Sequence, residues 1–247
     1  MSDVSGEKST PTSLGATTPR RGLDWPHALV ELATVVIGIL IALAVNNWAQ
    51  ERHNAAVESS YLERLLADST ENVTLLEERI KTHGRRADIL ARLITWLTNG
   101  TQPPSNDEVS DVLCRWFMQP SLPLRRETYA DLVSTGNLSL LRDVPLRGLL
   151  EQAETRYQET LRLDRFMDTL QRVAEPLNLY RKWEIDPNGR SGVGCRFDLQ
   201  GMRSDSAIPS ILAQVYRDET LTRSFREREL AAVRAVHDRI LKRQSPP

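Results

Sequence analysis

The sequence predicts an all-α protein in which one N-terminal transmembrane helix continues into an antiparallel helical bundle. Three observations lead to this prediction. The segment 29–45 is apolar and long enough to cross a bilayer. Beyond it, apolar residues recur at spacings of three and four over most of the chain, as on one face of a helix. Proline and glycine, which interrupt helices, are sparse in the middle of the chain and dense at residues 1–22 and 184–209.

The composition limits the classes of protein that need to be considered. The chain has 247 residues, enough for one globular domain beyond the apolar segment. Its formal net charge is −1, whereas a nucleic-acid-binding protein would carry a concentrated basic patch. We therefore expect no nucleic acid as a partner. Residues 1–24 are rich in Ser, Thr, Pro and Gly and are expected to form a disordered tail.

The segment Leu29–Val45 is predicted to span a membrane. Eleven of its residues are Leu, Ile or Val, and together they favour insertion by about 3–7 kcal/mol. Its one charge, Glu31, lies about one turn from the end, where it can reach the interface. Trp25 and Trp48 are separated by ~35 Å of helix at ~1.5 Å per residue, so an indole can anchor each interface of a ~30 Å hydrocarbon core. The sequence thus predicts a transmembrane helix over 25–48, with the lipid bilayer as its first partner.

Two other interpretations of this segment compete. A buried helix of a soluble protein would usually keep a polar face over such a length, and this segment has none. A cleaved signal peptide could use Arg20 and Arg21 as its positive end and Ala42–Ala44 as its cleavage site. However, the apolar run exceeds the usual ~7–15 residues of a signal peptide, and Glu31 interrupts its start. An uncleaved anchor is therefore expected.

One stripe of this helix is suited to close helix contact. Thr34, Gly38, Ala42 and Asn46 recur at every fourth position. Gly38 and Ala42 form a small-xxx-small pair, the spacing that lets two membrane helices approach closely. The side chains of Thr34 and Asn46 could hydrogen-bond across such a contact. The stripe predicts a homodimer that forms through the transmembrane helix.

The charges that flank the helix predict its orientation. Arg20 and Arg21 precede it closely, and Arg52 alone lies as near on the other side. Since positive residues tend to stay on the cytoplasmic side, we expect the tail in the cytoplasm. The protein is then a single-pass protein of the bacterial inner membrane, with a soluble domain in the periplasm.

The two cysteines depend on this orientation. Cys114 and Cys195 are far apart in the sequence and do not have a metal-ligand spacing. In the periplasm they could form a disulfide, whereas in the cytoplasm they would be buried thiols. Both alternatives stay open at the level of the sequence.

Residues 49–98 are predicted to form a long helix or stalk. A heptad seam of mainly apolar residues runs along it: Leu62, Leu66, Ser69, Val73, Leu76 and Ile80. The seam could face a second chain in a coiled coil or face the rest of its own chain in a bundle. So much helix is predicted downstream that the second alternative is favoured.

The remaining chain is expected to complete the bundle. Residues 99–183 form its core, with a helix that starts at a capping box of Ser105 and Glu108 and another that ends at Gly136. Residues 184–207 are predicted as a loop region that could include one short strand at 193–199. Residues 208–243 are predicted as a C-terminal helical region.

Two stretches resemble an uncharacterised family of bacterial single-pass membrane proteins. Gly38–Trp48 matches the motif G-[IV]-L-I-A-L-x-[VI]-N-N-W of that family, and Glu127–Arg147 is similar to its interior segment. Ala44 departs from the Gln that the family often has there, and nothing after about residue 184 shows the resemblance. The resemblance implies an N-terminal anchor and a helical bundle. It implies no catalytic residues.

The sequence offers little that points to chemistry. Its four His residues have no ligand spacing, and no nucleotide-binding or nucleophile motif is present. The mixed charges at 147–165 predict a solvated helix face. Tyr129, Gly136 and Asn137 could form a recognition corner, or Tyr129 could be a core anchor and Gly136 a helix cap.

From these observations we expect no enzyme, no cofactor and no metal site. The leading hypothesis is a membrane-anchored helical interaction or scaffold protein whose protein partner the sequence does not identify. The alternative is a ligand-sensing ectodomain that works with a separate membrane partner.

Overall fold

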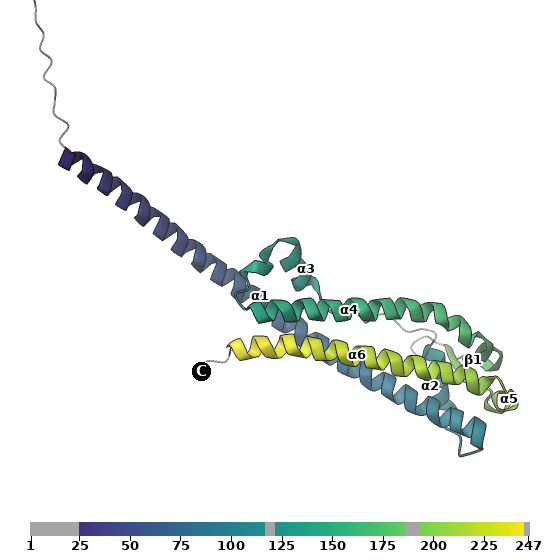
Figure 1. Cartoon of the computed structure of the whole chain (residues 1–247). Helices are drawn as coiled ribbons and strands as arrows, with labels where there is room; N and C mark the ends of the chain where they lie inside the picture. Colours follow the sequence, from purple (N-terminus) through teal and green to yellow (C-terminus); the bar gives the residue numbers. More distant parts are fainter. Residues whose placement is uncertain (1–24, 117–121, 186–192, 245–247) are drawn as a thin grey trace, which may run out of the picture. The chain divides into compact units, whose positions relative to one another are not determined.

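The computed structural model describes residues 25–116, 122–185 and 193–244 (Figure 1). The predicted all-α class is confirmed, with one short β-hairpin added to the helices. The chain forms two compact units, one that ends at His53 and one that starts at Asn54. In chain order the elements are α1 Trp25–Asn99, α2 Asn106–Trp116, α3 Glu127–Ser134, the 3-10 helix η1 Asn137–Leu140, α4 Val144–Leu170, the 3-10 helix η2 Gln171–Tyr180, β1 Arg181–Ile185, β2 Val193–Phe197, α5 Leu199–Ser204 and α6 Ile208–Gln244.

The first unit contains the apolar part of α1. In the described part of the chain, α1 is the one helix that is long and apolar enough to cross a membrane. The side chains of residues 29–53 are all exposed, and the two tryptophans, Trp25 and Trp48, are 66% and 60% exposed. The guanidinium of Arg52 lies 5.5 Å from the centre of the Trp48 ring. This unit therefore presents an apolar surface that its own residues do not cover.

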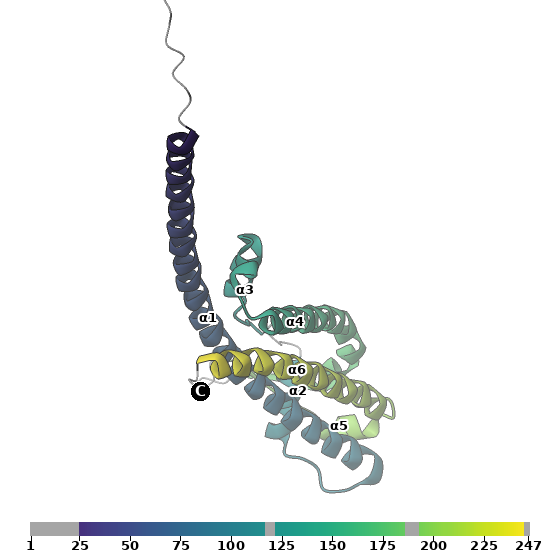
Figure 2. The ribbon, with the colours of Figure 1, turned by 60° about the vertical axis from the view of Figure 1, so that its left-hand side comes forward.

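The second unit is built on three long helices, namely the later part of α1, α4 and α6. Four ion pairs fix their directions: Glu58–Arg243 and Glu77–Arg234 between α1 and α6, and Asp143–Arg239 and Asp164–Arg226 between α4 and α6. In the α1–α6 pairs and in the α4–α6 pairs alike, the residue numbers of α6 fall as those of the other helix rise. Helix α6 is therefore antiparallel to α1 and to α4, and it lies beside α4 in both views (Figures 1 and 2).

Apolar side chains from these helices make the core of the second unit. The largest cluster joins α1 and α2 to η2, β2 and the start of α6. A second cluster joins α1 to α3, α4 and the end of α6. In the heptad seam, Leu62, Ser69 and Leu76 are buried and the other three positions are half-buried. The seam thus packs within its own chain, as the bundle interpretation predicts.

Local signals placed several helix ends correctly. The amide of Glu108 donates to the Ser105 hydroxyl (3.2 Å) and the Glu108 carboxylate accepts from the Ser105 amide (3.0 Å), so the predicted capping box is confirmed. Gly136 has a φ of +73°, the left-handed conformation that glycine adopts without strain, and it follows α3. Pro176 has no amide hydrogen to donate, and it lies in η2, where the chain has left the α-helical pattern.

Within the region 184–207, the possible short strand is present as β2, whereas residues 199–204 form helix α5 instead of a loop. Strand β1 pairs antiparallel with β2, with Trp183 opposite Cys195. Helix α5 follows, and the carboxylate of Asp198 caps it by accepting from the Gly201 amide at 3.0 Å. The sequence indicated the second strand but not its partner β1, because a two-stranded sheet is marginal by itself and pairing depends on distant contacts. The hairpin forms here because other elements hold it, as described below.

Candidate functional site

The stripe predicted on the apolar part of α1 is exposed along its whole length. Thr34, Gly38, Ala42 and Asn46 are all exposed. A Cβ atom added to Gly38 would meet nothing within 4 Å. The Thr34 hydroxyl donates to the Val30 carbonyl of its own helix at 2.8 Å. Within the described residues of its own chain, nothing covers this stripe.

The predicted recognition corner is divided by the fold. The amide of Asn137 donates to the Tyr61 hydroxyl (3.1 Å), which donates in turn to Asp131 (3.1 Å). Gly136 shapes the turn between α3 and η1, as the capping alternative predicts. Tyr129 is half-buried and lines a cavity described below. Asn137 thus contacts α1 through Tyr61, whereas Tyr129 contributes to the cavity wall.

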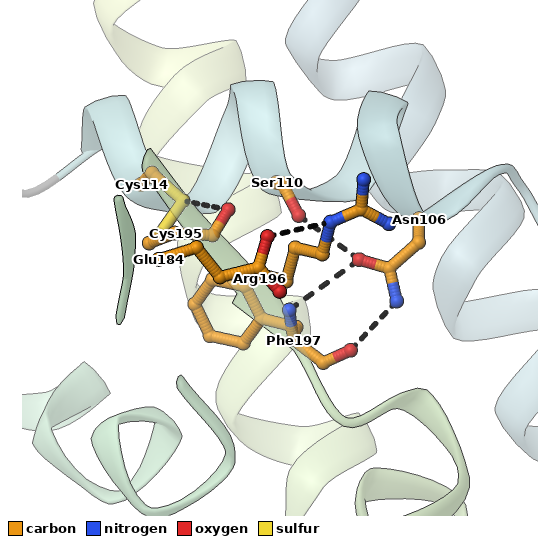
Figure 3. Close-up of a disulfide and its surroundings, with 7 residues drawn as sticks. All are labelled: Asn106, Ser110, Cys114, Glu184, Cys195, Arg196 and Phe197. Atoms are coloured by element: carbon orange, nitrogen blue, oxygen red, sulfur yellow. Dashed lines mark hydrogen bonds and ion pairs between the residues drawn. A yellow bond between two sulfur atoms is a disulfide. The ribbon is translucent and has the colours of Figure 1, made fainter. Parts of the chain in front are cut away.

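Cys114 of α2 and Cys195 of β2 form a disulfide, with their Cα atoms 6.2 Å apart (Figure 3). Beside it, the Asn106 side chain continues the sheet: its amide donates to the Phe197 carbonyl (2.7 Å), and its oxygen accepts from the Phe197 amide (3.4 Å). Ser110 donates to the same oxygen at 3.0 Å. These contacts attach the hairpin to α2 and explain why it forms.

A layer of buried charged residues crosses the middle of the bundle, and no pattern in the sequence predicted it. His83 Nδ1 of α1 lies 2.5 Å from Glu219 Oε2 of α6, and the two side chains are 2% and 1% exposed. Arg86 Nη1 donates to the other oxygen of Glu219 at 3.5 Å. The positions 219, 226 and 229 on α6 follow helical spacing, so one face of this helix carries charge into the core.

Arg226 is the centre of the second half of this layer. Its guanidinium donates to Asp164 of α4 at 2.6 Å and to Glu229 of its own helix at 2.9 Å. The side chain of Arg226 is 6% exposed, and that of Glu229 is 0% exposed. Burial, together with the positive charges of Arg226 and Arg86, lowers the pKa of Arg79. The solvated face predicted for 147–165 is therefore not correct for Asp164, which pairs with a buried cation.

A cavity of about 70 Å³ adjoins this layer, between α1, α4, α6 and the start of α3. The apolar residues of its wall include Leu65, Leu124, Leu150, Ala153, Val233 and Val236. Asn72 positions the segment that closes one side, because its amide group donates to the Arg125 carbonyl (2.8 Å) and accepts from the Arg125 amide (2.7 Å). The same segment places Arg126 against the cavity.

The polar groups around the cavity are unequally satisfied. Arg126 Nε donates to Glu154 at 3.0 Å, and its guanidinium lies 4.0 Å from the centre of the Tyr157 ring. Burial opposes ionisation of Glu154, yet hydrogen bonds from Arg126 and Gln158 lower its pKa. By contrast, two acceptors, Asp68 Oδ2 and Glu229 Oε1, and one donor, Arg226 Nε, are buried without a hydrogen-bond partner among the described residues.

The carboxylates at the cavity favour a ligand that donates hydrogen bonds or carries positive charge. Burial raises the pKa of Glu229, although the charge of Arg226 and its hydrogen bond act in the opposite direction. Burial, then the negative charges of Glu151 and Glu154, raises the pKa of Tyr129. In the described part of the chain, no group of three His, Cys, Asp or Glu side chains is arranged to hold a metal ion. The arrangement can accept hydrogen bonds and hold positive charge.

The chain finds no match among protein-family models, curated proteins or solved structures. The class of protein is therefore defined by its structure alone: an all-α chain with one apolar helix near its N-terminus and a disulfide-containing helical bundle. The resemblance of Gly38–Trp48 and Glu127–Arg147 to a bacterial single-pass family stays a prediction.

Proposed function

We propose that this protein is a single-pass membrane protein whose helical bundle acts as an interaction or scaffold domain for another protein. One observation carries the proposal. Every side chain at positions 29–53 is exposed, and most of those at positions 29–45 are apolar. Such a surface is stable only when lipid or another apolar helix covers it. The resemblance to a family of anchored bacterial proteins supports the same assignment.

The proposal includes a bundle in the periplasm of a bacterium. The Arg20–Arg21 pair favours a cytoplasmic tail, and the Cys114–Cys195 disulfide suits an oxidising compartment. Alkaline phosphatase fused after Pro247 should therefore be active, and green fluorescent protein fused there should be dark. Both fusions should stay in the membrane pellet after extraction with alkaline carbonate. A bright fusion without phosphatase activity would place the bundle in the cytoplasm and contradict this orientation.

Self-association through the transmembrane helix is the most direct test of an interaction role. Gly38 is the smallest residue of the exposed stripe, and a side chain there would hold two helices apart. We expect Gly38→Ile to lower the self-association of the full-length protein in a bacterial two-hybrid assay by about fivefold or more, which corresponds to roughly 1 kcal/mol.

Ile37→Leu is the matched control for this substitution. Ile37 is also exposed on the apolar helix but lies outside the stripe, and Leu keeps its volume and hydropathy. The control should associate as the unchanged protein does. Equal signals from both variants would remove the stripe from the proposal and leave the bundle as the surface for interaction.

A second candidate function is ligand sensing by the bundle, together with a separate membrane partner. The specific observation in its favour is the cavity, where two buried carboxylate oxygens, Asp68 Oδ2 and Glu229 Oε1, have no protein partner among the described residues. Unsatisfied buried acceptors are costly in a bundle that has only a structural task.

A further inference from the structure

We propose that the cavity between α1, α4 and α6 binds a small organic cation with a primary ammonium group, held by the carboxylates of Asp68 and Glu229. This inference deepens the sensing alternative and does not depend on self-association of the transmembrane helix. It assigns a ligand class to a site composed only of residues in the second unit.

The two unpartnered oxygens define where the ligand would be bound. Glu229 is 0% exposed, and its Oε2 accepts from Arg226 while its Oε1 has no partner. Asp68 lines the same cavity from α1, and its Oδ2 is likewise buried without a partner. The hydroxyl of Thr160, near Glu229, donates to the Arg156 carbonyl at 2.9 Å. An ammonium group has three donors and no acceptor, so its chemistry matches a cavity with unpartnered carboxylate oxygens.

The charge around the cavity also favours a cation. Arg226 faces two carboxylates, those of Asp164 and Glu229, so these three groups carry one negative charge in excess when both carboxylates are ionised. Arg79 adds a positive charge near Asp164, but the carboxylate of Asp68 at the cavity is also negative. Buried charges are stable in proteins when they are paired, and a bound ammonium group would balance the carboxylate of Asp68.

The two arginines at the cavity are committed to other carboxylates. Arg125 Nε donates to Glu71 at 3.0 Å, and both side chains are about half exposed. Arg126 pairs with Glu154 through both ends of its guanidinium. A ligand with its own negative group would meet the carboxylates of Asp68 and Glu229, while Arg125 and Arg126 are already paired. The lining therefore favours a cation over an anion.

The walls and the volume limit the rest of the ligand. A volume of about 70 Å³ has room for roughly five to seven water-sized groups at about 10–15 Å³ each. Apolar side chains make up much of the wall, and Tyr129 and Tyr157 also line it. A short alkylammonium ion meets these requirements, because its chain contacts the walls while its head reaches the carboxylates.

Exposure of the lining shows from which side a ligand would enter. The lining residues from α1 and α6 are mostly buried, whereas Arg125 is exposed and Arg126, Tyr129 and Tyr157 are half-buried. The side formed by the segment before α3, by α3 and by α4 is therefore nearest to solvent. This is the side that Asn72 fixes through its two hydrogen bonds to Arg125.

The test uses the full-length protein in detergent and n-butylammonium chloride as the probe. We expect a saturable rise in Tm when the probe is added, because a ligand that binds only the folded state stabilises it. 1-Butanol has nearly the same shape without the charge, and sodium chloride has the ionic strength without the chain. Neither should produce a saturable rise.

Two isosteric variants test whether the probe binds in the cavity. Asp68→Asn and Glu229→Gln should each raise the apparent Kd by about tenfold or more, measured against the Tm of each variant without ligand. Glu78→Gln is the matched control, because Glu78 is an exposed carboxylate on the same helix as Asp68. A rise that 1-butanol reproduces, or that persists in both cavity variants, would overturn the proposal.

Two probes, n-butylammonium and Nα-acetyl-lysine amide, distinguish a free amine from the lysine side chain of a partner protein as the natural ligand. A free amine and a lysine side chain of a partner protein end in the same group. Binding of n-butylammonium together with exclusion of Nα-acetyl-lysine amide supports a free amine as the natural ligand. Binding of both supports the same carboxylate site and assigns it to a lysine side chain, whereas binding of neither contradicts the proposal.

Discussion

Replacing Arg226 by Met is expected to lower the free energy of unfolding by about 3–5 kcal/mol. Arg226 is 6% exposed and is the cation between Asp164 and Glu229. Its removal would leave two carboxylates facing each other in the core without the positive charge that balances them. The loss is large because it comes from unpaired buried charge and not from the ion pair alone. Chemical denaturation followed by circular dichroism measures it.

The pH dependence of this variant checks the cause. Burial already raises the pKa of Glu229 above its ordinary value, so this group contributes most to stability at low pH, and its contribution is lost as the pH rises through the raised pKa. Without Arg226 the pKa of Glu229 rises further. The difference between variant and unchanged protein should therefore be smaller at about pH 5 than at about pH 8.

Arg234→Met is the matched control on the same helix. Arg234 pairs with Glu77, but both side chains are about half exposed, so its loss should cost no more than about 1 kcal/mol. Similar losses for Arg226→Met and Arg234→Met would mean that burial does not set the energy of these pairs. A penalty for Arg226→Met that is independent of pH would contradict the role given to Glu229.

Replacing both Cys114 and Cys195 by Ser is expected to lower the free energy of unfolding by about 2–4 kcal/mol. The disulfide joins residues 81 positions apart, so it restricts the unfolded chain over a long loop. The loss should concentrate in α2 and the hairpin, since the bond joins α2 to β2. Hydrogen exchange of the backbone amides, together with denaturant unfolding, measures both the size and the place of the effect.

A reductant provides the control for this prediction. Reduced wild-type protein should unfold at the same denaturant concentration as the double variant, and the reductant should not affect the variant. Asn106 would still hold Phe197 through its two hydrogen bonds, so the hairpin should loosen without losing its register. A wild-type protein that is purified without reductant and whose unfolding is insensitive to added reductant would show that the cysteines are not paired.

The sequence by itself determined the features that depend on near neighbours along the chain. The apolar segment Leu29–Val45 is recognisable because its length and composition alone decide whether it can cross a bilayer. The capping box at Ser105 and the left-handed turn at Gly136 are decided within four residues. The helical spacing of the apolar residues likewise predicted that the seam from Leu62 to Ile80 belongs to a helix with one buried face.

Only the tertiary structure decided which charged residues are buried. Asp164 and Arg226 are 62 residues apart, and each taken alone has the spacing of a solvated helix face. The same holds for Glu229 and Asp68, which reach one cavity from two antiparallel helices. The hairpin also depends on distant groups, namely the Asn106 amide and the Cys114–Cys195 bond. The physical reason is common to all of them: burial of a charge and pairing of an isolated strand depend on partners far along the chain, and periodicity does not carry that information.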